Sequence, residues 1–351
     1  MNRILALAGL AILLSACPAA EPAPDPAVTA LHWTFDSSMV FPADQSLHRA
    51  EDGVALPDGS LLVADQISGL RRVNPDGTSE PFGDLVGKGY QHRPPEHSGG
   101  ANGVSLEPDG KHVLLADVFG AGIYRVDVAT GATEKVYQHR YGINTAIRDS
   151  HGAIWFTQST RNTPEAGEAS LWASVDAPRP DGALFRLPAG SSDPELMVDS
   201  LRFANGVAID ESNGWLYLAE TIGGRVLRFR VDPARGTLTD RSVFADSVGA
   251  DNVELDGAGN LWIASPLTNE VLVVDLATGA RRSVFQAFTA EQQATVEEFT
   301  RRGATGASRM GLISPANWAP LPGMLTGVIV GPGTGPVYFT GLGNALLRLP
   351  R

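Results

Sequence analysis

Short stretches in which apolar and polar residues alternate follow one another along most of the chain after residue 45. Val54 and Leu56, like Val104 and Leu106, are separated by single residues, which is the period-two pattern of a strand with one buried face. Turn sequences ending in glycine, such as Pro57-Asp58-Gly59, separate neighbouring stretches and predict tight hairpins. Helical periodicity is nearly absent, so the pattern predicts an all-β fold.

The alternating stretches are copies of one unit. Each copy has a polar residue, an alternating run, a turn ending in Gly and a second β-rich run, and the sixth copy is degraded. The copies begin 42 to 75 residues apart, at Glu51, Asn102, Asn144, Asn205, Asp251 and Thr326. The shortest spacings fit one four-stranded propeller blade, and the longer ones contain insertions. We therefore expect a six-bladed β-propeller with a short helical insertion. A β-sandwich or an open array of hairpins is the alternative, whereas the lack of helix-length connections argues against a parallel α/β sheet.

Two insertions interrupt the repeats. Residues 159–181 are irregular and contain proline, whereas residues 285–303 have the one good helical pattern, with Thr289 as candidate N-cap. The expected apolar stripe of this helix consists of Phe285, Phe288, Val296 and Phe299. Such a helix packs on the side of the propeller or forms a lid over the central channel. The sequence does not decide which segment closes the ring, since the strand before His48 and the tail after Gly341 are both candidates.

The N-terminus has the features of an export signal. Arg3 precedes an apolar run, Ile4–Leu14, which is too short to span a bilayer and fits a signal-peptide core. Leu14-Ser15-Ala16-Cys17 resembles the bacterial lipobox, in which the cysteine is lipidated; an ordinary secretory signal is the alternative. We expect a signal peptide at residues 1–16, a Pro/Ala-rich tether at 17–30 and the propeller at 31–351. By resemblance to lipoprotein sorting, Pro18 predicts an anchor in the outer membrane of a bacterial envelope, facing the periplasm.

Composition excludes several classes of function. The chain has 27 Lys and Arg against 39 Asp and Glu, a formal charge of −12, so we expect no nucleic-acid partner. Its one cysteine excludes a disulfide framework, a cysteine-based zinc site and an iron–sulfur cluster. The G-x-S-x-G motif of serine hydrolases and the H-E-x-x-H motif of zinc proteases are both absent.

The first polar residue of each of the first five units stands eight residues before the turn glycine, or nine in the fourth unit. These residues therefore hold equivalent positions near the start of the innermost strands, which predicts a ring around the central channel. The ring consists of Glu51, Asn102, Asn144, Asn205 and Asp251, with Asn252 beside the last. Carboxylate and amide oxygens suit Ca²⁺ better than Mg²⁺ or Mn²⁺, and the lack of imidazole or thiolate argues against zinc or copper. Capping of inner-strand turns is the alternative role.

Four motifs resemble the gluconolactonase and senescence-marker-protein (regucalcin) superfamily, mainly its strictosidine-synthase-like and paraoxonase-like branches, across about residues 45–350. They are Phe203-Ala-Asn-Gly-Val-Ala-Ile, Tyr217-Leu-Ala-Glu-Thr, Arg225-Val-Leu-Arg-Phe and Asp251-Asn-Val. The resemblance implies a six-bladed propeller with a divalent cation, usually Ca²⁺, in its channel. By the same resemblance, the metal ligands are Glu51, Asn144, Asn205 and Asp251, and Asn252 matches a further ligand of the paraoxonase-like branch.

The resemblance implies hydrolysis of a small-molecule lactone or ester, in which the cation polarises the carbonyl group. It assigns Asp251 as the catalytic general base. We expect Asn102 and His97 to contact substrate, since His97 lies in the loop before the ring residue. Paraoxonases carry a His where Asn102 stands, which argues against a His-assisted mechanism, and the acidic ring argues against a metal-free condensation. A non-catalytic envelope propeller that binds a partner or sugar around a structural cation is the alternative.

Overall fold

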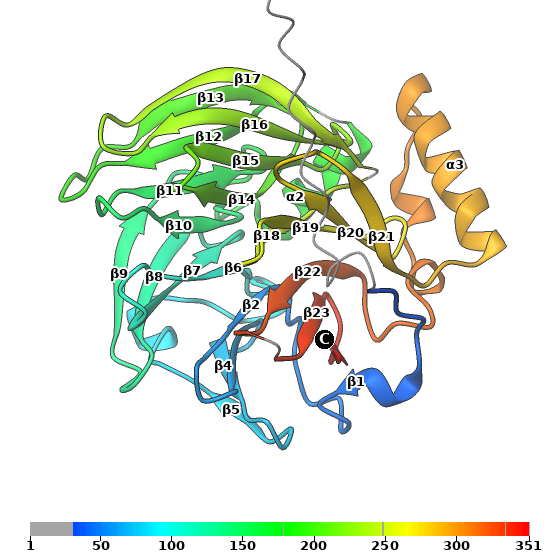
Figure 1. The fold of residues 1–351 in the computed structure, drawn as a ribbon, viewed down its shortest axis with the longest axis horizontal. Coiled ribbons are helices and arrows are strands. Elements are labelled where there is room, and N and C mark those ends of the chain that lie inside the picture. Colours follow the sequence, from blue (N-terminus) through cyan, green and yellow to red (C-terminus); the bar gives the residue numbers. More distant parts are fainter. Residues whose placement is uncertain (1–30, 178, 248, 334, 351) are drawn as a thin grey trace, which may run out of the picture.

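The computed structural model describes residues 31–350 apart from 178, 248 and 334. Within these residues the strands form six four-stranded sheets that fan around one axis (Figure 1). The first strand of each of five sheets contacts the first strand of the next, and β22 contacts β2, so the inner strands form a closed ring. The prediction of an all-β, six-bladed propeller is confirmed. The predicted signal peptide, tether and lipidated Cys17 lie outside the described residues.

The strands of blades 1 to 3 follow the chain from the axis outward. Blade 1 is β2 (Gly53–Ala55), β3 (Leu61–Asp65), β4 (Gly69–Val73) and β5 (Ser79–Pro81). Blade 2 is β6 (Ala101–Leu106), β7 (His112–Asp117), β8 (Gly122–Asp127) and β9 (Thr133–Gln138). Blade 3 is β10 (Ala146–Arg148), β11 (Ile154–Gln158), β12 (Gly182–Leu187) and β13 (Glu195–Leu201).

Blades 4 and 5 repeat this order, whereas blade 6 combines both ends of the described chain. Blade 4 is β14 (Ala204–Asp210), β15 (Trp215–Glu220), β16 (Arg225–Asp232) and β17 (Thr237–Asp246). Blade 5 is β18 (Val253–Leu255), β19 (Asn260–Ser265), β20 (Glu270–Asp275) and β21 (Arg281–Gln286). Blade 6 is β22 (Leu325–Val330), β23 (Val337–Gly341), β24 (Leu346–Leu349) and β1 (Val40–Phe41).

The ring is closed by β1, which pairs antiparallel with β24 and supplies the outermost strand of blade 6. Trp33 extends this closure, because its backbone N–H donates to Val284 O (2.8 Å) in blade 5 and its indole N–H donates to Pro350 O (3.0 Å). Both segments that the sequence left as candidates for closure thus lie in one blade.

Apolar side chains hold neighbouring blades together. A separate buried cluster lies at each of the six blade-to-blade contacts, and the largest, between blades 5 and 6, includes Trp33, Trp262, Phe285 and Phe339. Both faces of the middle strands are covered in this arrangement, which is why β3 and β19 are buried along their whole length.

Alternate blades carry a bulge in the inner strand near its ring position. A glycine follows the ring position there, at Gly103, Gly206 and Gly327. A Cβ on Gly206 would lie 2.7 Å from the Cα of Asn252 in the next blade, and one on Gly103 would lie 2.8 Å from the Cα of Thr145. Glycine is required at these positions because neighbouring inner strands approach too closely for a side chain.

Two α-helices lie outside the blades among the described residues. Helix α2 (Gly167–Asp176) falls in the insertion that was expected to be irregular, which the sequence failed to show because its apolar residues form no clear stripe and no side chain caps its start. Helix α3 (Ala290–Thr305) has the predicted Thr289 cap, in a reciprocal pair with Gln292. Phe285 lies in β21 and Phe288 precedes the Thr289 cap, so only Val296 and Phe299 of the expected apolar stripe lie in α3.

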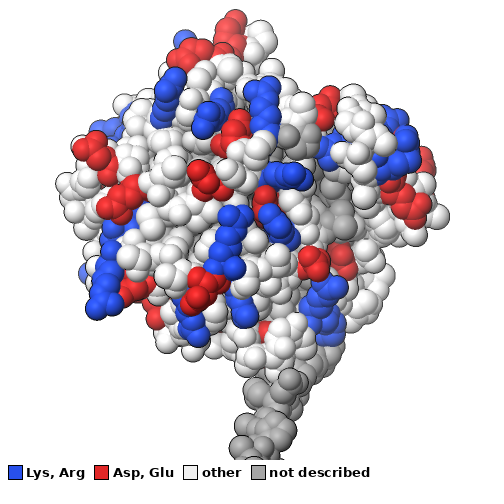
Figure 2. Space-filling model, turned by 90° about the horizontal axis from the view of Figure 1, so that it is seen from above, with Lys and Arg blue, Asp and Glu red and all other residues white. Residues whose placement is uncertain are grey.

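Short 3₁₀ turns complete the structure: η1 (Ser37–Met39), η2 (Val86–Lys88), η3 (Met310–Leu312) and η4 (Pro315–Asn317). None of the described helices has the length and apolar character needed to cross a membrane. Basic and acidic side chains are interspersed on the face seen in Figure 2 rather than gathered into a patch of one sign.

Candidate functional site

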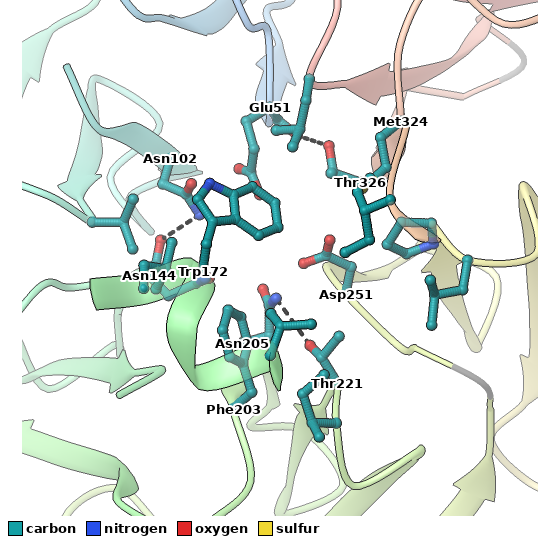
Figure 3. A pocket seen from close by; sticks show the side chains of 18 of the residues that line it. Glu51, Asn102, Asn144, Trp172, Phe203, Asn205, Thr221, Asp251, Met324 and Thr326 are labelled. Atoms are coloured by element: carbon teal, nitrogen blue, oxygen red, sulfur yellow. Dashed lines mark hydrogen bonds between the residues drawn. The ribbon is translucent and has the colours of Figure 1, made fainter. Parts of the chain in front are cut away.

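Five predicted ring residues line one cavity on the propeller axis (Figure 3). Glu51, Asn144 and Asp251 stand just before the first strand of their blades, whereas Asn102 and Asn205 lie within β6 and β14. The cavity has a volume of about 90 Å³. The repeat register thus brings side chains from five blades to one point.

The sixth blade contributes Thr326, which sequence reasoning left without a role. Its hydroxyl donates to Glu51 O (2.7 Å), and the hydroxyl of Thr340 donates to the same carbonyl (2.7 Å). Both bonds are buried and fix the backbone of Glu51. The sixth position therefore supports the ring rather than adding a further amide or carboxylate.

Three ring oxygens are buried without any hydrogen-bond partner: Glu51 Oε2, Asn205 Oδ1 and Asp251 Oδ1. A buried polar atom left unpaired costs about 1–3 kcal/mol, so three such atoms lining one cavity need an explanation. All three are hard oxygen donors, and the Asn144 amide oxygen, which accepts from the Thr145 hydroxyl (3.0 Å), adds a fourth to the same cavity. This donor set fits a divalent cation such as Ca²⁺.

The backbone is left-handed near the same three residues. Arg49, Phe203 and Gly249 each stand two positions before a ring residue that has an unpaired oxygen, and each has a left-handed backbone, with φ of 57°, 66° and 70°. This conformation is unusual for an arginine or a phenylalanine and costs on the order of 1–3 kcal/mol. Strain of this kind is typical of functional sites, where it aims a side chain.

Burial acts strongly on the two ring carboxylates. It raises the pKa of Asp251 to about 8 and the pKa of Glu51 well above its usual range, where the charge of Asp251 adds to the effect. Two carboxylates that share a buried site repel one another, and a bound cation would offset both the repulsion and the cost of ionisation. The raised pKa values and the unpaired oxygens therefore both fit a site for a cation.

Arg49 is a cavity residue that the sequence did not reveal, because no repeated motif marks its position. Its guanidinium donates from Nη2 to Asn102 Oδ1 (3.2 Å) and from Nη1 to Ala101 O (2.8 Å), and lies 5.6 Å from the ring centre of Phe119. The amide oxygen of Asn102 is therefore already bonded. Asn102 thus differs from the ring residues whose oxygens are unpaired.

Two other predicted site residues lie apart from this cavity. Asn252 lines a second cavity at the opposite end of the channel and donates from Nδ2 to Glu51 Oε1 (3.2 Å). His97 exchanges backbone hydrogen bonds with Arg93 in the loop before β6, and it does not line the ring cavity. The structure thus places Asn252 behind Glu51 and His97 outside the cavity wall.

Apolar side chains form the remaining wall, and most of them were not predicted. They include Leu171, Trp172 and Val175 from α2 and Phe299 from α3. The residues that complete this wall lie in loops and in insertions without a repeat pattern. Phe299 shows that the predicted helix contributes to the mouth of the channel.

A second group of possible metal ligands, Glu107, Asp109 and His112, lies near the β6–β7 turn of blade 2. The Glu107 carboxylate accepts bonds from Arg125 Nε (2.9 Å) and Arg148 Nε (2.6 Å). Because arginines already compensate this acidic cluster, the channel ring is the site that fits a cation better.

A family model described as the SMP-30/Gluconolactonase/LRE-like region matches residues 122–295, about half of the chain. The chain belongs to the SMP-30/gluconolactonase-like family. In this family member the matched segment contains Asn144, Asn205 and Asp251, whereas Glu51 and Asn102 precede it.

Known proteins agree with this membership. The adipocyte plasma membrane-associated protein hemomucin of Drosophila melanogaster is 23% identical over 175 residues, 46% of this chain and 29% of that protein. Lactonohydrolase oryL of Aspergillus oryzae is 26% identical over 129 residues, 35% of this chain and 28% of that protein. The chain thus matches less than a third of the length of these two relatives. A gluconolactonase structure from Xanthomonas campestris has a TM-score of 0.59 at 20% identity, covering 96% of this chain and 99% of that one, which shows the same fold.

Proposed function

We propose that this protein is a hydrolase of a lactone or ester that works with a divalent cation held in the channel. The observation that carries the proposal is the set of three buried, unpaired oxygens that line one cavity from blades 1, 4 and 5. Membership of the SMP-30/gluconolactonase-like family and similarity to a lactonohydrolase support a lactone as the substrate.

Glu51, Asn144, Asn205 and Asp251 would hold the cation, and Ca²⁺ is the ion that their oxygens suit best. Asn252 supports this set from behind, since its amide orients Glu51. When bound, such a cation polarises a substrate carbonyl and stabilises the oxyanion formed from it.

Asp251 is our candidate for the general base. Its Oδ1 lacks a partner inside the cavity, where it can accept a proton from an attacking water. A carboxylate that binds a cation is a weaker base, so its basicity depends on how it shares its two oxygens. Arg49 adds a fixed positive charge beside Asn102, and the apolar wall keeps bulk water away from the reacting carbonyl.

Metal content and hydrolysis, measured on the same preparations, test this proposal. Wild type should contain one divalent cation and hydrolyse members of a lactone and ester panel, and a chelator should abolish turnover. Glu51→Gln should lose both the cation and turnover. Glu80→Gln, the same change at an exposed position, is the matched control and should retain both.

Either of two results would contradict the proposal. A folded protein without bound metal would remove the cation, and the unpaired oxygens would need another explanation. Metal without turnover on any lactone or ester would favour a binding propeller that is only stabilised by its cation.

We also propose that Cys17 is lipidated and anchors the propeller in the bacterial envelope, at the periplasmic side of the outer membrane. The lipobox-like sequence around Cys17 and the proline-rich tether support this location. In cell fractions, the full chain should sediment with outer membranes, and Cys17→Ser should be released from them. Equal release of both would refute the anchor.

A further inference from the structure

Two insertions form the roof of the ring cavity. Helix α2 lies between β11 and β12 and contributes Trp172, whereas the segment between β21 and β22 contributes Phe299 and Ile313. Figure 3 shows the Trp172 indole in front of the ring side chains, on the side from which α2 enters. The space above the proposed cation is therefore enclosed by aromatic and aliphatic groups.

The polar groups of this wall outside the ring already have partners within the protein. Arg49, the charged group among them, donates to Ala101 O (2.8 Å) and Asn102 Oδ1 (3.2 Å). The Trp172 indole N–H donates to Glu168 Oε1 (3.0 Å), the Thr221 hydroxyl to Ala250 O (2.8 Å) and the Thr326 hydroxyl to Glu51 O (2.7 Å). A sugar lactone would lose hydrogen bonds from its hydroxyls to water without regaining them from these side chains. Removing a hydroxyl from water without a new partner is costly, whereas burying a methylene is favourable.

The two insertions are joined into one roof. The Asp176 carboxylate, at the end of α2, accepts from the backbone N–H groups of Arg309 (2.5 Å) and Met310 (2.7 Å) and from the Ser308 hydroxyl (2.8 Å). Arg309 in turn lies over the Phe299 ring at 4.7 Å from its centre. The apolar wall is therefore held in place before a ligand enters, which favours selection by shape and polarity.

We propose that the cavity selects lactones or esters with apolar substituents over sugar lactones, and that Trp172 and Phe299 are its specificity-determining residues. This inference rests on the proposed function for its chemistry. The selectivity is argued from the apolar wall alone, so the proposed hydrolysis and the proposed selectivity can fail separately.

A series of γ-lactones with lengthening alkyl chains, from γ-butyrolactone to γ-decalactone, measures the selectivity, with glucono-δ-lactone as the polar comparison. The kcat/KM should rise about fourfold for each methylene that enters the cavity. Trp172→Ala and Phe299→Ala should each lower the ratio of kcat/KM for γ-decalactone to that for γ-butyrolactone about tenfold. Trp215→Ala, on a tryptophan outside this cavity, is the matched control and should keep the wild-type ratio. Thermal unfolding of each variant separates selectivity from misfolding.

The outcomes separate the inference from the proposed function. If glucono-δ-lactone is hydrolysed as well as γ-decalactone, or if neither variant changes the ratio, the inference is wrong and the hydrolase remains. If no lactone is hydrolysed, the proposed function fails, and titration calorimetry decides the inference. Heat of binding from γ-decalactone that is absent with glucono-δ-lactone and lost in Phe299→Ala would support it. The absence of that difference would overturn it.

Discussion

In the metal-free protein, we predict that Asp251→Asn stabilises the fold at neutral pH. Burial raises the pKa of Asp251 from its ordinary 3.8 to about 8, so the folded protein retains a proton that the unfolded chain releases. A group whose pKa is raised in the folded state lowers the stability as pH rises between the two values. Asparagine removes this titration, so the free energy of unfolding of the variant should increase relative to that of wild type as pH rises over that range.

The magnitude follows from the same two values. One pKa unit corresponds to about 1.4 kcal/mol, so from about pH 4 to pH 7 the wild-type protein loses about 4 kcal/mol at this one residue. The pKa of Glu51 is raised in the same direction by burial and by the charge of Asp251, so replacing Asp251 also relieves Glu51. At about 2 °C per kcal/mol, the melting temperature of Asp251→Asn should exceed that of wild type by about 8 °C at pH 7.

Thermal unfolding in chelator, from about pH 4.5 to pH 7.5, measures this difference. Asp76→Asn is the control, because hydrogen bonds from Thr78 lower the pKa of that exposed carboxyl. The stabilising effect of ionised Asp76 is constant over that range and is lost only at lower pH, so the melting temperature of Asp76→Asn should run parallel to that of wild type, without a difference that grows with pH. Adding Ca²⁺ should raise the melting temperature of wild type and leave Asp251→Asn unchanged. A metal-free Asp251→Asn that melts below wild type at pH 7 would refute the reasoning.

Three further predictions concern the support of the ring. Gly206→Ala places a Cβ 2.7 Å from the Cα of Asn252, so it should destabilise the fold by about 1–3 kcal/mol and weaken cation binding in calorimetry, whereas Gly257→Ala, in open space, should do neither. Glu220→Gln keeps one oxygen that can accept from the Arg202 N–H but removes the charge and the oxygen that accepts from Arg225 Nε, so it should cost about 2 kcal/mol in denaturant unfolding with metal content unchanged; a loss of metal would contradict a purely structural role. Asp176→Ala removes three acceptor contacts and should expose residues 306–313 to limited proteolysis, and equal cleavage of both proteins would contradict the joined roof.

The blades and the ring were predictable because both depend on a repeat. Period-two alternation and turn glycines recur in each unit, and a constant distance to the turn places Glu51 and Asp251 at equivalent points of different blades. The equivalence of these points in space then follows from the propeller geometry. Asn252 is not marked by this register, and the structure places it in the second cavity with its amide donating to Glu51 Oε1 (3.2 Å).

What the sequence did not reveal lies outside the repeat. The position of Arg49, two residues before Glu51, holds glycine in the next two blades, so no pattern marks an arginine there. Helix α2 has a mixed sequence, and its Leu171 packs against Val118 and Phe119, which follow β7 in blade 2. Such elements depend on tertiary contacts, which a single sequence does not display.

The channel ring concentrates features that reduce stability. Glu51, Asn205 and Asp251 have unpaired buried oxygens, the first two follow a left-handed non-glycine residue by two positions, and the two acids ionise with difficulty. Single residues elsewhere share such features, since Asn162 and Asn269 also have a buried unpaired oxygen and Ala121 and Asn269 a left-handed backbone, but none of these lines the ring cavity. Natural sequences violate local rules mainly at functional sites. The concentration of these features in one cavity therefore supports the proposal that the ring binds a cation, which would supply a partner for the unpaired oxygens.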